Sequence, residues 1–439
     1  MTTTSLDRDS DPVSDSEPER EPDFDTKDPA FWADPYPVFA RFRNAAPVHR
    51  APKPFDGWFL FRYADVLQVC KDGVTFSADV DGDGAQCGMF QLDDPAHGLV
   101  RQRIATAWFE AASDAAARVD QSIKRTLDQI EKKASGGKAS DGKAYDGKSS
   151  DGKAFDLVDD FARPVPRDVY FDILGGAGID AQTRRDLDTL ARTVMKHHDH
   201  TFDETQQLPG TAAGKALGAQ LMALLAQARH GTAFEGSFLQ RLAPHVGDAP
   251  GNPLSTMVAV RSLVSMTVAG YMSVEFLLAT CVRRLLLDDA RWWQGVQKDP
   301  GLLSACLDEA RRCEHALSVV DRIATRDVEV GNKLIAKGDR VYGVLASANR
   351  DEAVYGKDAD EFNPGRHLSQ PHLGFGHGVH ECMGIHLQKL IAEPAIRALM
   401  TAWPGLRLAP NAQPSWFENF YFRSFDHLQV VEAVEVVMT

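Results

Sequence analysis

The 439-residue sequence lacks the marks of a secreted, membrane-spanning or nucleic-acid-binding protein. None of its six cysteines forms a CxxC pair and their spacing resembles no disulfide framework, so we expect a reducing, cytoplasmic environment. The N-terminal segment is acidic and has no apolar core, which argues against a secretory signal. The net charge of −14 argues against a nucleic acid as a partner.

The longest apolar stretch, residues 254–287, lacks the uninterrupted hydrophobicity of a membrane span, because Arg261 and Glu275 lie within it. As one helix it would be roughly 50 Å long and would cross the whole body of the protein. We therefore expect a central, buried helix and no membrane association.

The rest of the chain predicts a mainly α protein with minor β. We expect residues 1–28, which carry ten acidic and three basic side chains, to be a disordered tail, and residues 29–439 to form a single domain. A five-residue repeat (GKASD, GKAYD, GKSSD, GKAFD) occupies residues 137–156. It indicates a low-complexity insertion between helices, at residues 134–155.

Residues 375–384, FGHGVHECMG, surround Cys382 with glycine, histidine and phenylalanine, and four roles could explain this pattern. A zinc site could use His377, His380, Cys382 and His386, but structural zinc usually takes paired ligands from separate elements. A catalytic thiol would need a nucleophile signature, which the stretch does not carry. The ordinary role of an isolated cysteine is packing in the core. The fourth role is axial ligation of a haem iron by a thiolate.

Only axial ligation accounts for every residue of the stretch. A flat porphyrin can approach a backbone where Cβ atoms are absent, which explains Gly376 and Gly378. Gly384 would let the following helix lie close to the macrocycle. Phe375 would cover the sulfur, and His380 would donate a hydrogen bond to a carboxylate on the porphyrin rim.

A helix that starts at Cys382 would aim free N–H groups at the sulfur, lower the pKa of the thiol and keep it as a thiolate. The stretch resembles the F-G-x-G-x-H-x-C-x-G signature of the cytochrome P450 family at every fixed position. The resemblance covers nearly the whole chain from about Pro29. It implies the fold of that family, with a long central helix over haem b and Cys382 as the iron ligand.

Two further motifs extend the resemblance. Glu309-x-x-Arg312 is similar to the family's ExxR pair, and Arg366 resembles the third member of that structural network; the ordinary alternative for the pair is a surface ion pair on a helix. His97 and Arg101, one helical turn apart, resemble the pair that binds the haem propionates.

Arg322 matches a further propionate-binding arginine of the family, with a solvated strand charge as its alternative.

The central helix departs from the family pattern. Where the family has Ala-Gly-x-acid-Thr beside the iron, this sequence has Ala269 and Gly270, then tyrosine, Met272 and Ser273. Gly270 costs about 1 kcal/mol in a helix, so we expect either an opening beside the iron or a close helix-packing contact. Ser273 keeps the hydroxyl, but Met272 cannot relay a proton. Glu275 lies two residues beyond Ser273, about 200° around the helix, and is a poor substitute for the missing acid.

The resemblance implies a haem-thiolate monooxygenase that inserts one oxygen atom from O2 into a small, apolar organic substrate of secondary metabolism. Electrons would come from NAD(P)H through a separate ferredoxin and ferredoxin reductase, and we expect a monomer. The missing acid keeps two alternatives open. One is a peroxide-driven or non-hydroxylating oxidation, such as coupling, cyclisation or desaturation; the other is a non-enzymatic haem-binding or sensing protein.

Overall fold

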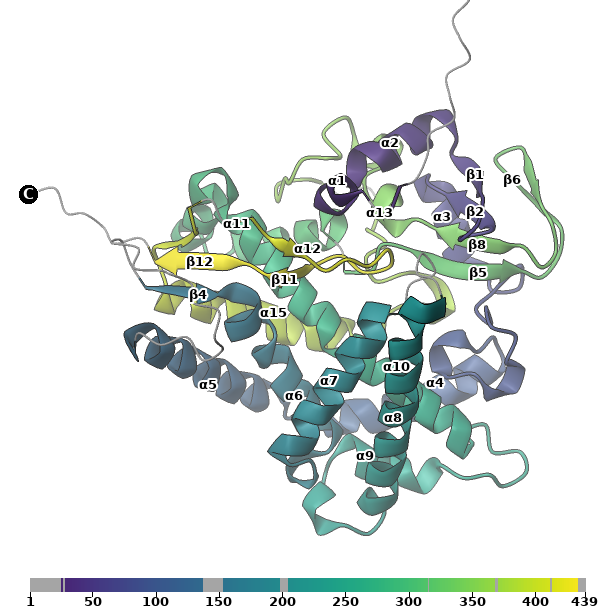
Figure 1. The fold of residues 1–439 in the computed structure, drawn as a ribbon, viewed down its shortest axis with the longest axis horizontal. Coiled ribbons are helices and arrows are strands. Elements are labelled where there is room, and N and C mark those ends of the chain that lie inside the picture. Colours follow the sequence, from purple (N-terminus) through teal and green to yellow (C-terminus); the bar gives the residue numbers. More distant parts are fainter. Residues whose placement is uncertain are drawn as a thin grey trace, which may run out of the picture.

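The computed structural model describes residues 25–26, 28–136, 153–197, 204–314, 316–367, 370–410 and 413–432. Helices build most of this part of the chain, and small sheets lie at the upper right and at the left of the view in Figure 1. The predicted mainly α fold with minor β is confirmed. Almost all of the acidic tail and most of the repeat, residues 137–152, lie outside the described residues.

The edges of the predicted insertion belong to regular structure, because helix α5 continues to Gly136 and strand β4 begins at Ala154. The α-helices are α1 (Pro29–Ala33), α2 (Tyr36–Ala45), α3 (Tyr63–Lys71), α4 (Ala96–Ala111), α5 (Ala115–Gly136), α6 (Pro164–Leu174), α7 (Ala181–His197), α8 (Glu204–Ala228), α9 (Phe238–Leu242), α10 (Thr256–Gly270), α11 (Met272–Lys298), α12 (Leu302–Cys313), α13 (Leu345–Ala348), α14 (Glu352–Tyr355) and α15 (Ile385–Ala402).

The strands form one five-stranded sheet, one three-stranded sheet and two hairpins. They are β1 (Val48–Ala51), β2 (Gly57–Leu60), β3 (Phe76–Ser77), β4 (Ala154–Asp156), β5 (Val320–Ala324), β6 (Val328–Val330), β7 (Lys333–Ile335), β8 (Arg340–Gly343), β9 (Leu406–Leu408), β10 (Ser415–Trp416), β11 (Phe425–His427) and β12 (Gln429–Glu432). The larger sheet has the order β1-β2-β8-β5-β3, and only its β2–β8 pair is parallel.

We predicted a single central helix over residues 254–287. This prediction is wrong in one respect, because the structure divides the span into α10 and α11. Ser255 caps α10 by accepting a hydrogen bond from the backbone N–H of Val258. The division falls at Tyr271, whose φ of −111° departs from the usual helical value while its ψ of −29° stays in the helical range. Backbone dihedrals at residues 287–290 interrupt α11 a second time. The predicted span therefore contains two helix segments with a break near its middle.

Burial explains the apolar composition of this central pair. By length and composition alone, residues 256–298 could cross a membrane, but 67% of the apolar window is buried inside the protein. Helices α12 and α15 pack against α11, and the largest apolar core surrounds it. A second apolar core lies against the five-stranded sheet. The central pair is thus a core element of the helical part of the fold.

Candidate active site

The stretch around Cys382 forms a short loop before α15. Its backbone is held by a hydrogen bond from the N–H of Cys382 to the carbonyl oxygen of Phe375, at 2.9 Å. The N–H of Gly384 donates to the Cys382 Sγ atom at 3.3 Å. Helix α15 begins at Ile385, three residues later than the predicted start at Cys382. The sulfur therefore lies just ahead of the helix, and Cys382 is exposed in the chain alone.

We predicted a lowered pKa for the Cys382 thiol, and this prediction is wrong for the protein chain without a bound group. Loss of solvation raises the pKa of the thiol, although the N–H groups of Gly384 and Ile385 and the charge of Arg101 lower it. The predicted effect of the N–H groups is present, but it is smaller than the cost of placing charge where protein replaces much of the water. A cation bound to the sulfur would reverse that balance.

The glycines of the cysteine loop allow its backbone conformation and its close packing against neighbouring segments. Gly376 has a φ of +67°, and Gly378 has a φ of +78°, a conformation that side chains disfavour. A Cβ on Gly378 would also come within 2.6 Å of the Cys70 carbonyl oxygen at the end of α3. At Gly384 a Cβ would meet Cys382 Sγ at an ordinary 3.6 Å. Close approach to α3 thus explains Gly378, which we had assigned to a porphyrin contact.

Four basic side chains come together beside Cys382 from three parts of the chain: His97 and Arg101 of α4, Arg322 of β5, and His380 of the loop. The rings of His97 and His380 lie 4.1 Å apart. Burial and the charges of Arg322, His97 and Arg101 lower the pKa of His380 to about 3. The four residues predicted to bind propionates are therefore neighbours in the structure.

The described residues around this basic cluster offer it few hydrogen-bond acceptors. His97 is 2% exposed and its Nδ1 lies 3.6 Å from Asp94 Oδ1, but neither ring nitrogen forms a hydrogen bond with the part of the chain that the structure describes. Arg101 donates to the backbone carbonyl of Glu381 at 2.6 Å, and Arg322 donates to that of Asp321 at 2.7 Å. Because buried polar groups are normally hydrogen-bonded, the imidazole and the neighbouring arginines indicate a hydrogen-bond acceptor that the described residues do not supply. The two propionates of haem b fit this set of donors.

The predicted structural network is present. Arg312 donates to both carboxylate oxygens of Glu309, at 2.7 and 2.8 Å, and Arg366 Nε lies 3.3 Å from Glu309 Oε1. Burial opposes ionisation of Glu309, but the hydrogen bonds and charge of Arg312 outweigh it and lower the pKa of the carboxyl group. Arg312 also donates to the carbonyls of Asn349, Ala359 and Glu361, so it ties α12 to the segment that leads to the cysteine loop.

The central helix presents one partly open face. The half-buried residues follow helical spacing along α10 and into α11, while their neighbours are buried. They include Val264, Val268, Ala269 and Ser273. Ala269 and Ser273, which we predicted beside the iron, therefore share a face that larger side chains do not fill. Met272 is fully buried and contributes no titratable group.

Gly270 makes the packing contact that was one of its two expected roles. A Cβ at this position would lie 2.7 Å from Cε2 of Tyr170 in α6. The Tyr170 hydroxyl lies 3.2 Å from the Thr267 hydroxyl oxygen, which fixes the ring against α10. The missing side chain therefore lets α10 and α6 approach each other.

Glu275 faces away from Ser273, in agreement with our expectation that it is a poor substitute for the missing acid. Its carboxylate is fully buried, is hydrogen-bonded by Arg192 of α7, and lies 3.5 Å from Arg163 Nε. Burial raises the pKa of this carboxyl group, against the lowering effect of Arg192 and Arg163. The local sequence around Glu275 carries no sign of these partners, because they lie about a hundred residues away along the chain.

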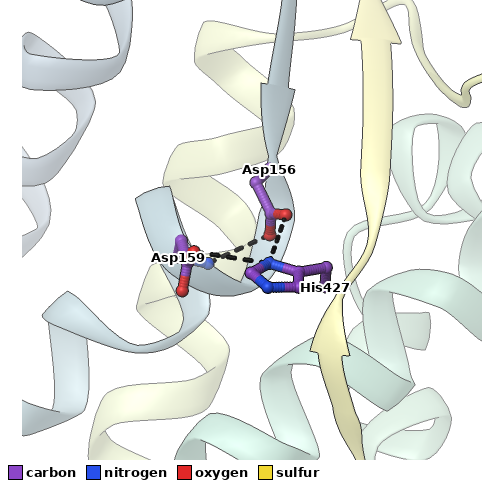
Figure 2. Close-up of side chains that lie close together, drawn as sticks. All are labelled: Asp156, Asp159 and His427. Atoms are coloured by element: carbon purple, nitrogen blue, oxygen red, sulfur yellow. Dashed lines mark hydrogen bonds and ion pairs between the residues drawn. The ribbon is translucent and has the colours of Figure 1, made fainter. Parts of the chain in front are cut away.

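A second side-chain cluster, Asp156, Asp159 and His427, lies between β4 and β11 (Figure 2). One oxygen of Asp156 accepts hydrogen bonds from the N–H groups of Val158 and Asp159. The other lies 3.0 Å from His427 Nδ1 and accepts from Gln429 at 2.9 Å. Since the protein already satisfies this carboxylate, the cluster ties two segments together.

The comparisons with known proteins agree with this geometry. The sequence model of the family described as Cytochrome P450 matches residues 296–401, which include the Glu309 network and the cysteine loop. The described part of the chain also superposes on a Bacillus subtilis polyketide synthase cytochrome P450, PksS. That match has a TM-score of 0.78 and 22% identity, and covers 94% of this chain and all of the other.

This chain belongs to the cytochrome P450 family.

Curated bacterial relatives align with almost the full length of this P450. Nocardicin C N-oxygenase of Nocardia uniformis subsp. tsuyamanensis is 29% identical over 407 residues, which cover 89% of this chain and 94% of the relative. Epothilone C/D epoxidase of Sorangium cellulosum is 27% identical and covers 94% and 96% of the two chains. Erythromycin C-12 hydroxylase of Saccharopolyspora erythraea is 27% identical, with coverage of 80% and 82%. The P450 is therefore a monooxygenase, and the non-enzymatic alternative is not favoured.

Proposed function

We propose that Cys382 is the axial thiolate ligand of haem b, and that this P450 uses the cofactor to oxygenate a small, apolar organic molecule of secondary metabolism. The observation that supports the proposal is the buried His97, whose ring forms no hydrogen bond among the described residues, within a group of basic side chains next to Cys382. Bound haem supplies oxygen activation at its iron. The chain holds the group and controls access to it.

Each part of the candidate site has a distinct task in binding. His97, Arg101, Arg322 and His380 would hold the propionates, because together they offer charged and neutral donors at one edge of the site. The Phe375 ring, which lies 5.7 Å from the Arg311 guanidinium, would shield the sulfur side from water. The Glu309 network would keep the cysteine loop in place.

Ser273, on the half-buried face of α11, would offer its hydroxyl for a hydrogen bond to the reacting molecules. Ala269 would leave room for the reacting molecules on the same helix face. Since Met272 cannot carry a proton, protons would arrive through solvent or substrate groups instead of through an adjacent acid.

Two features support an apolar natural product as the substrate. The partly open face of α10 carries Val264 and Val268, which pack at the edge of the main apolar core. The relatives are named for the oxygenation of nocardicin C, epothilone C/D and erythromycin. Electrons would come from NAD(P)H through a ferredoxin and its reductase, since the sequence carries no flavin or nucleotide motif. We expect a cytoplasmic monomer.

The carbon monoxide difference spectrum of the reduced protein tests the ligand assignment. We expect the thiolate-type band in the wild type, and its loss in Cys382→Ser with an unchanged far-ultraviolet circular dichroism spectrum. Another cysteine of this chain, Cys306→Ser, is the matched control and should keep the band. A Cys382→Ser protein that retains the band, or a wild type that binds haem without sulfur coordination, would refute the assignment.

Oxygen uptake with a surrogate ferredoxin system, compared with turnover in hydrogen peroxide, tests the reaction type. The proposal expects oxygen-dependent product with the redox partners. Equal or better turnover with peroxide would favour the peroxide-driven alternative.

A further inference from the structure

Two residues of α7 contact Tyr271, which lies between α10 and α11, and Glu275 in the first turn of α11, and the two pairs have the same spacing. Tyr271 Oη donates to Asp188 Oδ1 at 2.6 Å, and Arg192 Nη2 donates to Glu275 Oε2. Asp188 and Arg192 are four residues apart on α7, as are Tyr271 and Glu275 at the start of α11. Arg192 Nε also lies 3.4 Å from Asp188 Oδ1, so the two pairs form one unit, the α7 clamp.

The α7 clamp is attached at the break between α10 and α11. Tyr271 is the residue between the two helices, with a φ of −111° at the edge of the helical region, and the first turn of α11 begins with the N–H of Glu275 donating to the Tyr271 carbonyl oxygen at 3.0 Å. The break contains no proline, so we attribute it to Gly270 and to the groups that contact Tyr271. Here the Tyr271 ring packs on those of Tyr170 and Phe171, and its hydroxyl is held by α7.

Burial makes these polar contacts strong and specific. Tyr271 is 1% exposed, and Glu275 is fully buried. Two more arginines approach the clamp, with Arg163 Nε 3.5 Å from Glu275 and Arg167 Nη1 3.8 Å from Asp188. Removing one member of such a buried group takes a close partner from a buried charge, which is costly, so the clamp resists rotation of the helix.

Ser273 lies midway between the two gripped residues. Tyr271 and Glu275 are 400° apart along the helix and so share one face, while Ser273 is 200° from each and lies on the opposite, half-buried face. Rotation of the first turn of α11 would therefore move the Ser273 hydroxyl directly. We propose that Asp188 and Arg192 are positioning residues, which fix the orientation of Ser273 through Tyr271 and Glu275.

The inference deepens the proposed function, because it rests on Ser273 facing the site of oxygen reduction. It also assigns a purpose to Glu275 that differs from proton transfer. The Glu275 carboxylate forms an ion pair with Arg192 of α7, and this pair holds the helix that carries the Ser273 hydroxyl. The position of α7 and the geometry of the oxygen site are thereby coupled.

Amide hydrogen exchange tests the clamp without any cofactor. In Tyr271→Phe and Arg192→Gln, exchange of the amides of residues 272–276 should rise by roughly tenfold or more, because these groups open locally. Arg184→Gln is the matched control: Arg184 also lies on α7, and its Nη1 lies 2.6 Å from Asp172 Oδ1, but its partners are outside α11. The control should leave residues 272–276 unchanged.

Exchange in α15 separates a local effect from general destabilisation. A rise confined to the start of α11 supports the inference. An unchanged rate at residues 272–276, or an equal rise in α15, would overturn it.

The infrared C–O stretching band of the reduced, carbon-monoxide-bound protein tests the link to Ser273. Tyr271→Phe should shift or broaden the band in the wild-type background and have no further effect in a Ser273→Ala background. An equal change in both backgrounds would overturn the positioning role. If the wild type lacks thiolate coordination, the proposed function fails, whereas the exchange measurement still decides whether the clamp holds the helix.

Discussion

Gly270 and Tyr170 define how closely α10 approaches α6, since a single added Cβ at Gly270 would come within 2.7 Å of the Tyr170 ring. Tyr170 is 1% exposed and is also held by its hydroxyl contact with Thr267, so the ring has little freedom to move. The contact lies one residue before the break in the central helix. Packing at this point therefore helps to set where α10 ends.

Gly270→Ala should destabilise the protein by about 1 to 3 kcal/mol, because overpacking outweighs the gain in helix propensity. Thermal and urea unfolding would measure this. Gly214→Ala in α8 is the control: its Cβ would meet only Val194 Cγ2, at an ordinary 3.8 Å, and the variant should be unchanged or up to about 1 kcal/mol more stable. A stabilising effect at Gly270 would contradict the packing role.

Arg312→Lys should lower stability by about 3 kcal/mol and reduce the amount of haem bound per chain. Lysine cannot reproduce the forked set of hydrogen bonds to Glu309 and to three backbone carbonyls. Urea unfolding and the ratio of haem to protein absorbance would check both effects. Arg397→Lys, which alters a more exposed pair with Glu393, should change stability by about 0.5 kcal/mol or less. Equal effects of the two variants would refute the network's role.

Glu314→Gln should remove a pH-dependent part of the stability. Burial opposes ionisation of Glu314, but Arg284, Arg423 and Arg350 outweigh it and lower the pKa to about 2. The folded-state pKa lies below the unfolded value of about 4.5, so the stabilisation is present above pH 4.5 and disappears as the pH falls toward 2. The wild type should exceed the variant by about 3 kcal/mol at pH 7. A difference that stays constant between pH 6 and pH 3 would contradict this assignment.

Met272→Glu should increase the product formed per oxygen consumed, by up to about tenfold, because it restores a carboxyl group beside Ser273. Met272→Gln has a similar shape but no acid, and should give no increase. With hydrogen peroxide as the oxidant, which brings its own protons, neither variant should exceed the wild type. An unchanged product yield in Met272→Glu would show that proton supply does not limit this P450.

Ser273→Ala should increase the hydrogen peroxide released per NAD(P)H consumed, since the hydroxyl at the half-buried face of α11 is lost. The peroxide assay and product analysis would be run together. Unchanged coupling in this variant would mean that protons and oxygen are controlled by groups other than Ser273.

Local sequence was a good guide where function depends on a few residues close together. The cysteine loop, the Glu309–Arg312 pair and the His97–Arg101 pair could be predicted because neighbours in the chain remain neighbours in a loop or a helical turn. The physical role of each residue in these motifs was harder to predict than its position. The positive φ of Gly378 and its close approach to α3 require glycine at this position. Loss of solvation raises the pKa of the Cys382 thiol, which the N–H groups alone would lower.

By itself the sequence determined the helical character of the chain, the identity of the iron-ligating cysteine we propose, and the absence of an acid before Ser273. Only the tertiary structure decided that the central helix breaks at Tyr271 and that Glu275 is committed to Arg192. The physical reason is that a break or a buried ion pair depends on which distant side chains arrive at the same place. Asp188 and Arg192 are about eighty residues from their partners, and nothing in the local pattern at either end specifies the meeting.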